Sequence, residues 1–130
     1  MSSIKSIIPE SIKHFRRQII QLAVSPIHFL YCAVKGVDWK YSWTFRGFPH
    51  FHKQPHSSIE IGKNFYAVSK MRWNSLGIFQ PVFINAFGIG SQITIGDDVG
   101  ISGCTITALK KINIGNRVLI GSGVLITDND

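Results

Sequence analysis

The chain has 130 residues, of which 45% are hydrophobic and 16% charged, and its formal net charge is +7. This composition can build a hydrophobic core, excludes a disordered chain, and at this length indicates one domain or part of one. The charge is uneven, because residues 1–73 hold eleven Lys and Arg against three acidic residues, whereas residues 74–130 hold three against four. The basic first part fits either a solvated face or an anionic partner, and for that partner we expect a membrane surface rather than nucleic acid.

The first predicted element is an amphipathic helix over residues 9–24. Its apolar stripe recurs at helical spacing, at Ile8, Ile12, Phe15, Ile19 and Leu22. Lys13, Arg16 and Arg17 make the opposite face basic. We therefore expect this helix to hold the protein near an anionic membrane surface or a lipid-linked substrate.

A second helix is predicted from Pro26 to about Lys35. Ser25 suits the N-cap of this helix, because its hydroxyl can accept a hydrogen bond from a free N–H of the first turn, and Gly36 suits the C-terminal stop. Residues 1–36 are therefore expected to be a helical segment.

The location of the protein is predicted from its thiols and its apolar runs. Cys32 and Cys104 lie in different segments and form no disulfide pattern, which predicts two free, buried thiols in a reducing compartment. The apolar run from Ile19 to Val34 is interrupted by polar residues and is shorter than the roughly 20 residues of a membrane-spanning helix. We expect a cytoplasmic protein, peripheral to the inner face of the membrane.

Residues 37–58 are rich in aromatic residues, Gly, Pro and His, and we expect an irregular segment that leads into the next part of the chain. His50, His52 and His56 alternate loosely within it. No Cys or acidic residue stands beside them at the spacing of metal ligands, so we expect no metal site.

From residue 93 onward the chain repeats an apolar residue, a gap, an apolar residue and a tight corner with a period of six. The pairs are Ile93/Ile95, Val99/Ile101, Thr105/Thr107, Ile112/Ile114, Val118/Ile120 and Val124/Ile126. A period of six fits neither a helix nor an ordinary sheet, because neither has a fixed corner every six residues. It predicts a parallel β-helix with three short strands per coil, in which residues 59–130 form about four coils.

The stacking of the coils is predicted from one extra residue among Ala108–Lys111, which makes successive coils 19 residues apart. That offset places three pairs in register: Val99 with Val118, Ile101 with Ile120, and Thr105 with Val124. The inward-facing side chains are expected at Ile95, Ile101, Ile114 and Ile120.

The stretches Ile93–Ile106 and Ile112–Asp130 together resemble the hexapeptide-repeat acyltransferases of the left-handed β-helix class. They are similar in particular to the O-acetyltransferases that modify bacterial surface polysaccharides. Shorter segments similar to that subgroup are Gly47–Pro49 before Ile59–Gly62, and Asn74–Gly77 before Pro81. The resemblance implies a left-handed parallel β-helix, acetyl-CoA as co-substrate, a cell-surface polysaccharide or its precursor as acceptor, and a homotrimer with active sites between subunits.

In that family a His that follows an acidic turn acts as the general base on the acceptor hydroxyl. The turn Thr127–Asp130 is of this kind, and the sequence stops there without such a His. The resemblance implies that Asp128 and Asp130 orient a His beyond the chain end, and that this chain alone is inactive. The alternative is that both are acidic residues of an ordinary corner.

Two further residues are candidates for binding the acceptor. Asn74 and Ser102 could lie along the substrate groove, although a loop Asn that satisfies backbone groups and a plain corner Ser explain them as well. The competing function is a non-catalytic solenoid fragment that binds a partner or oligomerises. A reading frame that continues beyond Asp130 with a nearby His would favour the enzyme.

Overall fold

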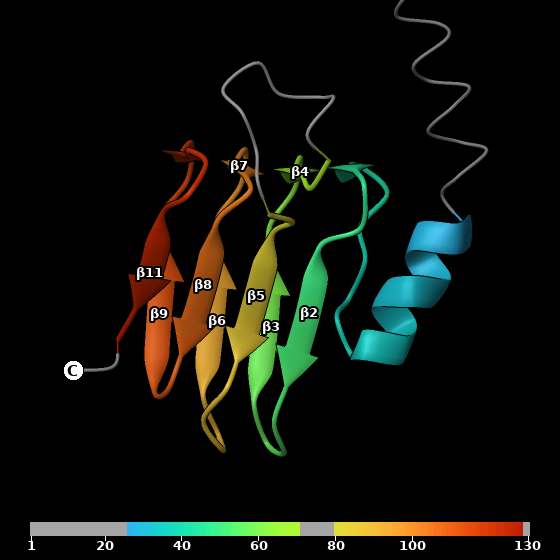
Figure 1. Cartoon of the computed structure of the whole chain (residues 1–130). Helices are drawn as coiled ribbons and strands as arrows, with labels where there is room; N and C mark the ends of the chain where they lie inside the picture. The colour runs from blue at the N-terminus through green and yellow to red at the C-terminus, as the bar shows by residue number, and fades with distance from the viewer. Residues whose placement is uncertain (1–25, 71–79, 129–130) are drawn as a thin grey trace, which may run out of the picture.

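The computed structural model describes residues 26–70 and 80–128 of the chain and shows a mainly β protein with one short helix (Figure 1). The predicted helix over residues 9–24 and the candidate residues Asn74 and Asp130 lie outside the described residues.

Within the described ranges the chain forms eleven short strands. They are β1 (Thr44–Arg46), β2 (His50–Lys53), β3 (Ser58–Ile61), β4 (Tyr66–Val68), β5 (Phe83–Ala86), β6 (Gln92–Ile95), β7 (Gly100–Ser102), β8 (Thr105–Ala108), β9 (Lys111–Ile114), β10 (Leu119–Ile120) and β11 (Leu125–Thr127). The strands make three sheets: a first of β1-β4-β7-β10, a second of β2-β5-β8-β11 and a third of β3-β6-β9. Every pair is parallel and the chain visits the three sheets in rotation, which is consistent with a parallel β-helix (Figure 1).

The core consists of inward side chains that stand in register across each sheet. These rows are Phe45, Ala67, Ile101 and Ile120 in the first sheet, Phe51, Ile84, Ile106 and Ile126 in the second, and Ile59, Ile93 and Ile112 beside Ile61, Ile95 and Ile114 in the third. Alternate residues of a strand face opposite sides, so each short strand sends one or two side chains inward, and β-branched residues fit these rows.

The six strands expected in the regular repeat are confirmed as β6–β11. Of the four predicted inward residues, Ile95, Ile101 and Ile120 are buried, and Ile114 is half-buried against the same core. The expected pairing of Ile101 with Ile120 is also confirmed.

The prediction for Thr105 and Thr107 is wrong. Thr105 pairs with Leu125 rather than Val124, and the inward residue between the two threonines is Ile106. The extra residue of the upper coil lies at the corner between β10 and β11, because Ile120 pairs with Ile101 at an offset of 19 whereas Leu125 pairs with Thr105 at an offset of 20. A shift of one residue exchanges the two faces of a strand, and this one turns both threonines outward.

Residues 37–58 are also more regular than predicted, because β1 and β2 lie within them and β3 begins at Ser58. Aromatic side chains fill this first coil where later coils use Ile and Val. Phe45 and Phe51 are its inward residues, and Trp43 is buried beside them, its indole N–H donating to Gly62 C=O at 2.7 Å. A search for Ile and Val pairs misses such a coil.

The predicted second helix is confirmed over residues 26–35. Gly36 ends it at φ +76°, with its N–H bonded to Ala33 C=O, while Val37 N–H reaches back to Cys32 C=O. These two bonds are the Schellman motif, in which Gly adopts a left-handed conformation without steric cost. The helix covers the aromatic first coil at one end of the stack, with Cys32 fully buried (Figure 1).

No helix among the described residues has both the length and the hydropathy that crossing a bilayer requires.

Candidate functional site

Asp128 lies immediately after β11, and its carboxylate is held by three backbone N–H groups. Oδ1 accepts from Leu109 at 2.6 Å, and Oδ2 accepts from Lys110 at 2.8 Å and Lys111 at 2.7 Å. These bonds, that from Leu109 first, favour the ionised form and hold the pKa of Asp128 below its usual value. The side chain therefore caps the corner between β8 and β9, as the corner interpretation of this residue predicts.

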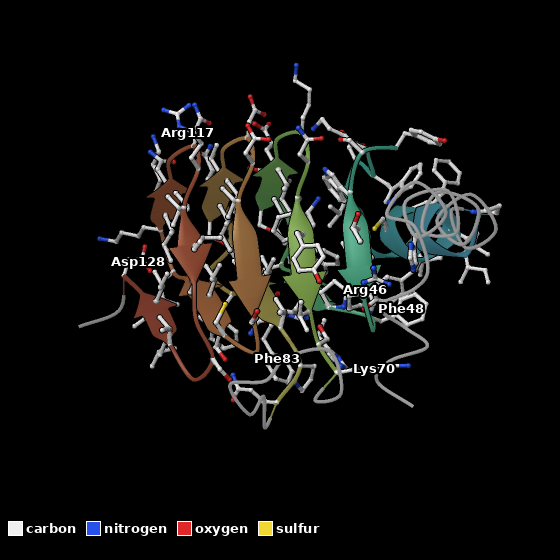
Figure 2. The ribbon with its side chains drawn as sticks, turned by 90° about the horizontal axis from the view of Figure 1, so that it is seen from above. Arg46, Phe48, Lys70, Phe83, Arg117 and Asp128 are labelled. Atoms are coloured by element: carbon white, nitrogen blue, oxygen red, sulfur yellow. The ribbon has the colours of Figure 1, made fainter. Side chains whose placement is uncertain are left out.

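The same bonds also give Asp128 the two properties needed to orient an imidazole. A carboxylate that supports a catalytic His must be ionised and must hold a fixed direction. Asp128 meets both conditions. It lies at the end of the stack opposite the helix, far from Phe48 (Figure 2).

Ser102 is the last residue of β7, half-buried, and pairs with Val68 of β4. The strand β8 separates its corner from the corner that Asp128 caps, so the structure does not bring these two candidate residues together.

The outer face of the second sheet carries a set of polar and aromatic side chains that sequence reasoning missed. His50 and Phe83 stack there with ring centroids 5.0 Å apart, and Asn85 Nδ2 donates to Thr107 Oγ1 at 3.4 Å. Gln80 Nε2 donates to the Oγ1 of Thr105 at 3.0 Å. The sequence signal for this face is the alternation of polar with apolar residues in β2, β5 and β8. It can be recognised only once the register of β8 is known.

This face is a flat platform of rungs, about 4.8 Å apart as in any sheet. In register across it stand His50, Phe83, Thr105 and Leu125 in one row and His52, Asn85, Thr107 and Thr127 in the other. It combines an aromatic ring face with neutral donors and acceptors, which are the groups that bind sugar rings and hydroxyls without charge.

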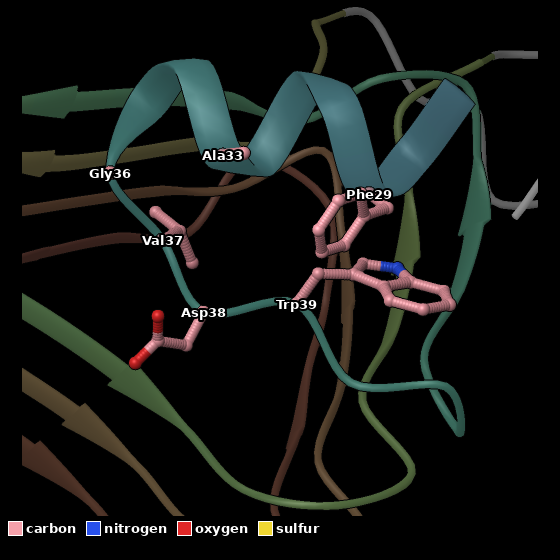
Figure 3. A pocket seen from close by; sticks show the side chains of 6 residues that line it. All are labelled: Phe29, Ala33, Gly36, Val37, Asp38 and Trp39. Atoms are coloured by element: carbon pink, nitrogen blue, oxygen red, sulfur yellow. The ribbon is translucent and has the colours of Figure 1, made fainter. Parts of the chain in front are cut away.

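A hollow of about 380 Å³ lies at the opposite end of the molecule, beneath the helix (Figure 3). Its lining consists of Phe29, Ala33, Gly36, Val37, Asp38 and Trp39. It is shallow, and its lining contains no imidazole.

Among the described residues, no three His, Cys, Asp or Glu side chains stand close enough together to hold a metal ion. Of the histidines, His28 packs against the rings of Phe45 and Phe48 at 5.1 and 5.5 Å, and burial lowers its pKa. His50 and His52 both lie in β2, on the outer platform.

Comparison with protein-family models, with curated proteins and with solved structures finds no significant match for this chain.

Proposed function

We propose that this chain forms coils of an acetyl-CoA-dependent O-acetyltransferase built on a left-handed parallel β-helix. The supporting observation is the rotation of short parallel strands through three sheets, with a rigid Asp128 carboxylate at the end of the segment that resembles these enzymes. The repeat itself serves other functions, so the proposal depends on the acidic turn as well as on the fold.

The proposed reaction moves an acetyl group from the thioester of acetyl-CoA to a hydroxyl of a polysaccharide or its lipid-linked precursor. The hydroxyl oxygen attacks the thioester carbonyl, a base takes its proton, and the CoA thiol leaves with a proton. In this proposal the carboxylates of Asp128 and Asp130 orient the His that acts as that base. The active enzyme is proposed to be a homotrimer.

The outer face of the second sheet is the proposed surface for the acceptor chain. The neutral ladder of Asn85 and Thr107 supports this role, because its amide and hydroxyl groups can exchange one partner for a sugar hydroxyl at little cost. Asn74 and Ser102 stay proposed as further acceptor contacts.

The acceptor surface can be tested by polysaccharide binding alone, without turnover. The double variant Asn85→Ala/Thr107→Ala removes two outward residues that are in register on the second sheet. Its matched control is Thr94→Ala/Asn113→Ala, which removes the same residue types in register on the third sheet. We expect the first variant to weaken binding of bacterial surface polysaccharides about tenfold and the control to bind as the wild type does. Equal binding by both variants would remove this face from the proposal.

The second function, a non-catalytic module that binds or oligomerises, is favoured by one observation. Leu119 and Leu125 at the end of the stack opposite the helix are 87% and 64% exposed. Acceptor-dependent release of CoA separates the alternatives: a pure binding module self-associates through this end and releases no CoA with any acceptor, whereas the enzyme releases CoA once its base is present.

A further inference from the structure

The helix over residues 26–35 covers the first coil with one face and leaves its other face apolar. His28, Tyr31 and Cys32 face the coil: the ring of Tyr31 lies 5.1 Å from that of Phe48, and its O–H donates to Pro49 C=O at 2.6 Å. The outward residues with large side chains are Ile27, Phe29, Leu30 and Val34, each more than half exposed. A helix in water normally carries polar residues on that face.

Aromatic residues extend this apolar face beyond the helix. The ring of Phe29 lies 6.3 Å from that of Trp39, and Trp39 lies 6.3 Å from Tyr41, in edge-to-face arrangements. Tyr41 is itself 62% exposed. The result is an apolar and aromatic surface at the end of the stack, here called the end face and defined by the exposed Ile27, Phe29, Leu30, Val34 and Tyr41 and by Trp39, which is half-buried against the core. Contiguous apolar surfaces of this kind mark sites of interaction.

The residues around the end face are basic. Residues 26–53 contain Lys35, Lys40, Arg46 and Lys53 against the single acid Asp38. Lys53 Nζ donates to Gly36 C=O at 2.9 Å, and Lys40 Nζ donates to Ile61 C=O, so both ammonium groups are fixed beside the first coil. An apolar helix face with Phe, Trp and Tyr and a lysine rim is the composition of helices that lie in the interface of an anionic bilayer.

We propose that the end face of helix 26–35 inserts into the interfacial layer of an anionic membrane, and that the stack of coils stands upright on that membrane with its strands parallel to the surface. The positive charge of this end complements acidic headgroups, which decides for a lipid surface over a second copy of the same basic end. The helix lies beyond β2 at one end of the stack (Figure 1). Its insertion would therefore leave the outer faces of the three sheets clear of the membrane. In this orientation the coils would stay in water, within reach of lipid-linked molecules at the membrane surface.

The test uses the full chain and sedimentation with vesicles of phosphatidylcholine, alone or mixed with an equal part of phosphatidylglycerol. The variant Leu30→Ser/Val34→Ser removes two outward side chains that are 63% and 76% exposed, so folding does not depend on them. Its matched control, Leu119→Ser/Leu125→Ser, removes apolar side chains from the opposite end that are at least as exposed, at 87% and 64%. We expect the first variant to lose about tenfold or more in partitioning to anionic vesicles and the control to keep wild-type partitioning.

Salt concentration distinguishes insertion of the end face from a purely electrostatic attachment through the basic segment that precedes the helix in the sequence. At about 0.5 M salt attraction between exposed charges is largely screened, whereas inserted apolar side chains keep their contacts. We therefore expect wild-type binding, once formed, to survive this salt concentration in part. Brominated lipid should also quench the fluorescence of the wild-type chain, and Trp39→Phe should reduce that quenching.

Three results would overturn the proposal. The first is wild-type vesicle binding by Leu30→Ser/Val34→Ser. The second is a lower unfolding midpoint of this variant without any change in vesicle binding, which would mean that residues 8–22 of the same chain cover the end face. The third is a wild-type dimer that binds no vesicles and that the variant dissociates, which would make the end face an interface between two copies.

Discussion

Asp97 occupies the space into which a side chain at Gly62 would project. A Cβ placed on Gly62 would lie 2.2 Å from Asp97 Oδ1, and that oxygen accepts the N–H of Lys63 at 2.8 Å. One coil later Asn116 stands in the same relation to Gly96, with its Oδ1 at 2.2 Å from a Cβ and bonded to Asp97 N–H at 2.7 Å. Glycine is required at these corners because the next coil caps the corner through the space where a Cβ would lie.

The first prediction compares two glycines of this column. Gly96→Ala should destabilise the fold by about 1–3 kcal/mol, because the new methyl group displaces the Asn116 amide and meets backbone atoms at 2.8 Å. Gly115→Ala should be neutral or stabilise by up to about 1 kcal/mol, because no atom of the described structure lies within 4 Å of its Cβ. Urea unfolding of both variants measures the difference. Equal costs at the two positions would contradict the capping role of Asn116.

The second prediction tests the register of β8. Ile106 is fully buried between Ile84 and Ile126, so Ile106→Asp leaves an unpaired charge in the core and should cost at least about 3 kcal/mol, enough to unfold the stack. The neighbouring variant Thr107→Asp should cost about 1 kcal/mol or less, because that side chain faces outward. Far-UV circular dichroism and melting temperature are the measurements. The opposite ranking would restore the inward placement of Thr107.

The repeat shows how far sequence could predict this fold. The spacing of Ile and Val predicted six strands, the inward Ile101 and its partner Ile120, because a six-residue period leaves one arrangement of corners and strands. It failed at Thr105 and Thr107, where the two coils differ by one residue at a corner and nothing in the sequence places that residue. It failed again in the first coil, where aromatic residues replace the expected Ile and Val.

The candidate site was less predictable than the fold. The sequence marked Asp128 as either a corner residue or an orienting carboxylate, and its three hydrogen bonds depend on the position of residues 109–111 one coil below. The outer platform of His50, Phe83 and Asn85 is built from β2 and β5, which are neighbours in the sheet although their paired residues are 33 positions apart in the sequence. No local sequence pattern indicates a pairing over that separation. Contacts between coils are set by the length of each coil.

The third prediction concerns the pH dependence that Asp128 gives to stability. Its pKa is lowered in the folded chain, so its stabilising effect is complete above the unfolded pKa of about 4 and is lost as the pH falls through the folded value. The difference in unfolding free energy between wild type and Asp128→Asn should therefore be largest at neutral pH and shrink below about pH 4. A difference that stayed constant down to pH 2 would contradict the capping bonds.

Hydrogen exchange tests the capping bonds of Asp128 amide by amide. In Asp128→Asn the amides of residues 109–111 should exchange faster, because the amide side chain offers one good acceptor oxygen in place of two. The amides of Ile93–Ile95 in the middle coil are the internal control and should exchange at wild-type rates.

The fourth prediction concerns the two thiols, which are both free and buried as the sequence predicted. Burial raises the pKa of Cys32 to about 12 and that of Cys104 to about 11. Neither is then ionised at pH 8, and a thiol reagent should label both only at the rate of unfolding. Fast labelling of Cys32 with protection of Cys104 would mean that the helix detaches from the first coil while the stack stays folded.

We propose that these coils belong to an O-acetyltransferase in which Asp128 orients the His that acts as general base. The measurement is acceptor-dependent release of the CoA thiol from acetyl-CoA, made on the 130-residue chain and on any longer product of its reading frame that carries a His after Asp130. We expect polysaccharide-dependent release by a product that carries this His, and no measurable turnover by residues 1–130, which have no His after the acidic turn, because a missing general base typically costs about 10²–10⁴-fold. Turnover at ordinary enzyme rates by the 130-residue chain, or none by a longer product that carries the His, would contradict the proposal.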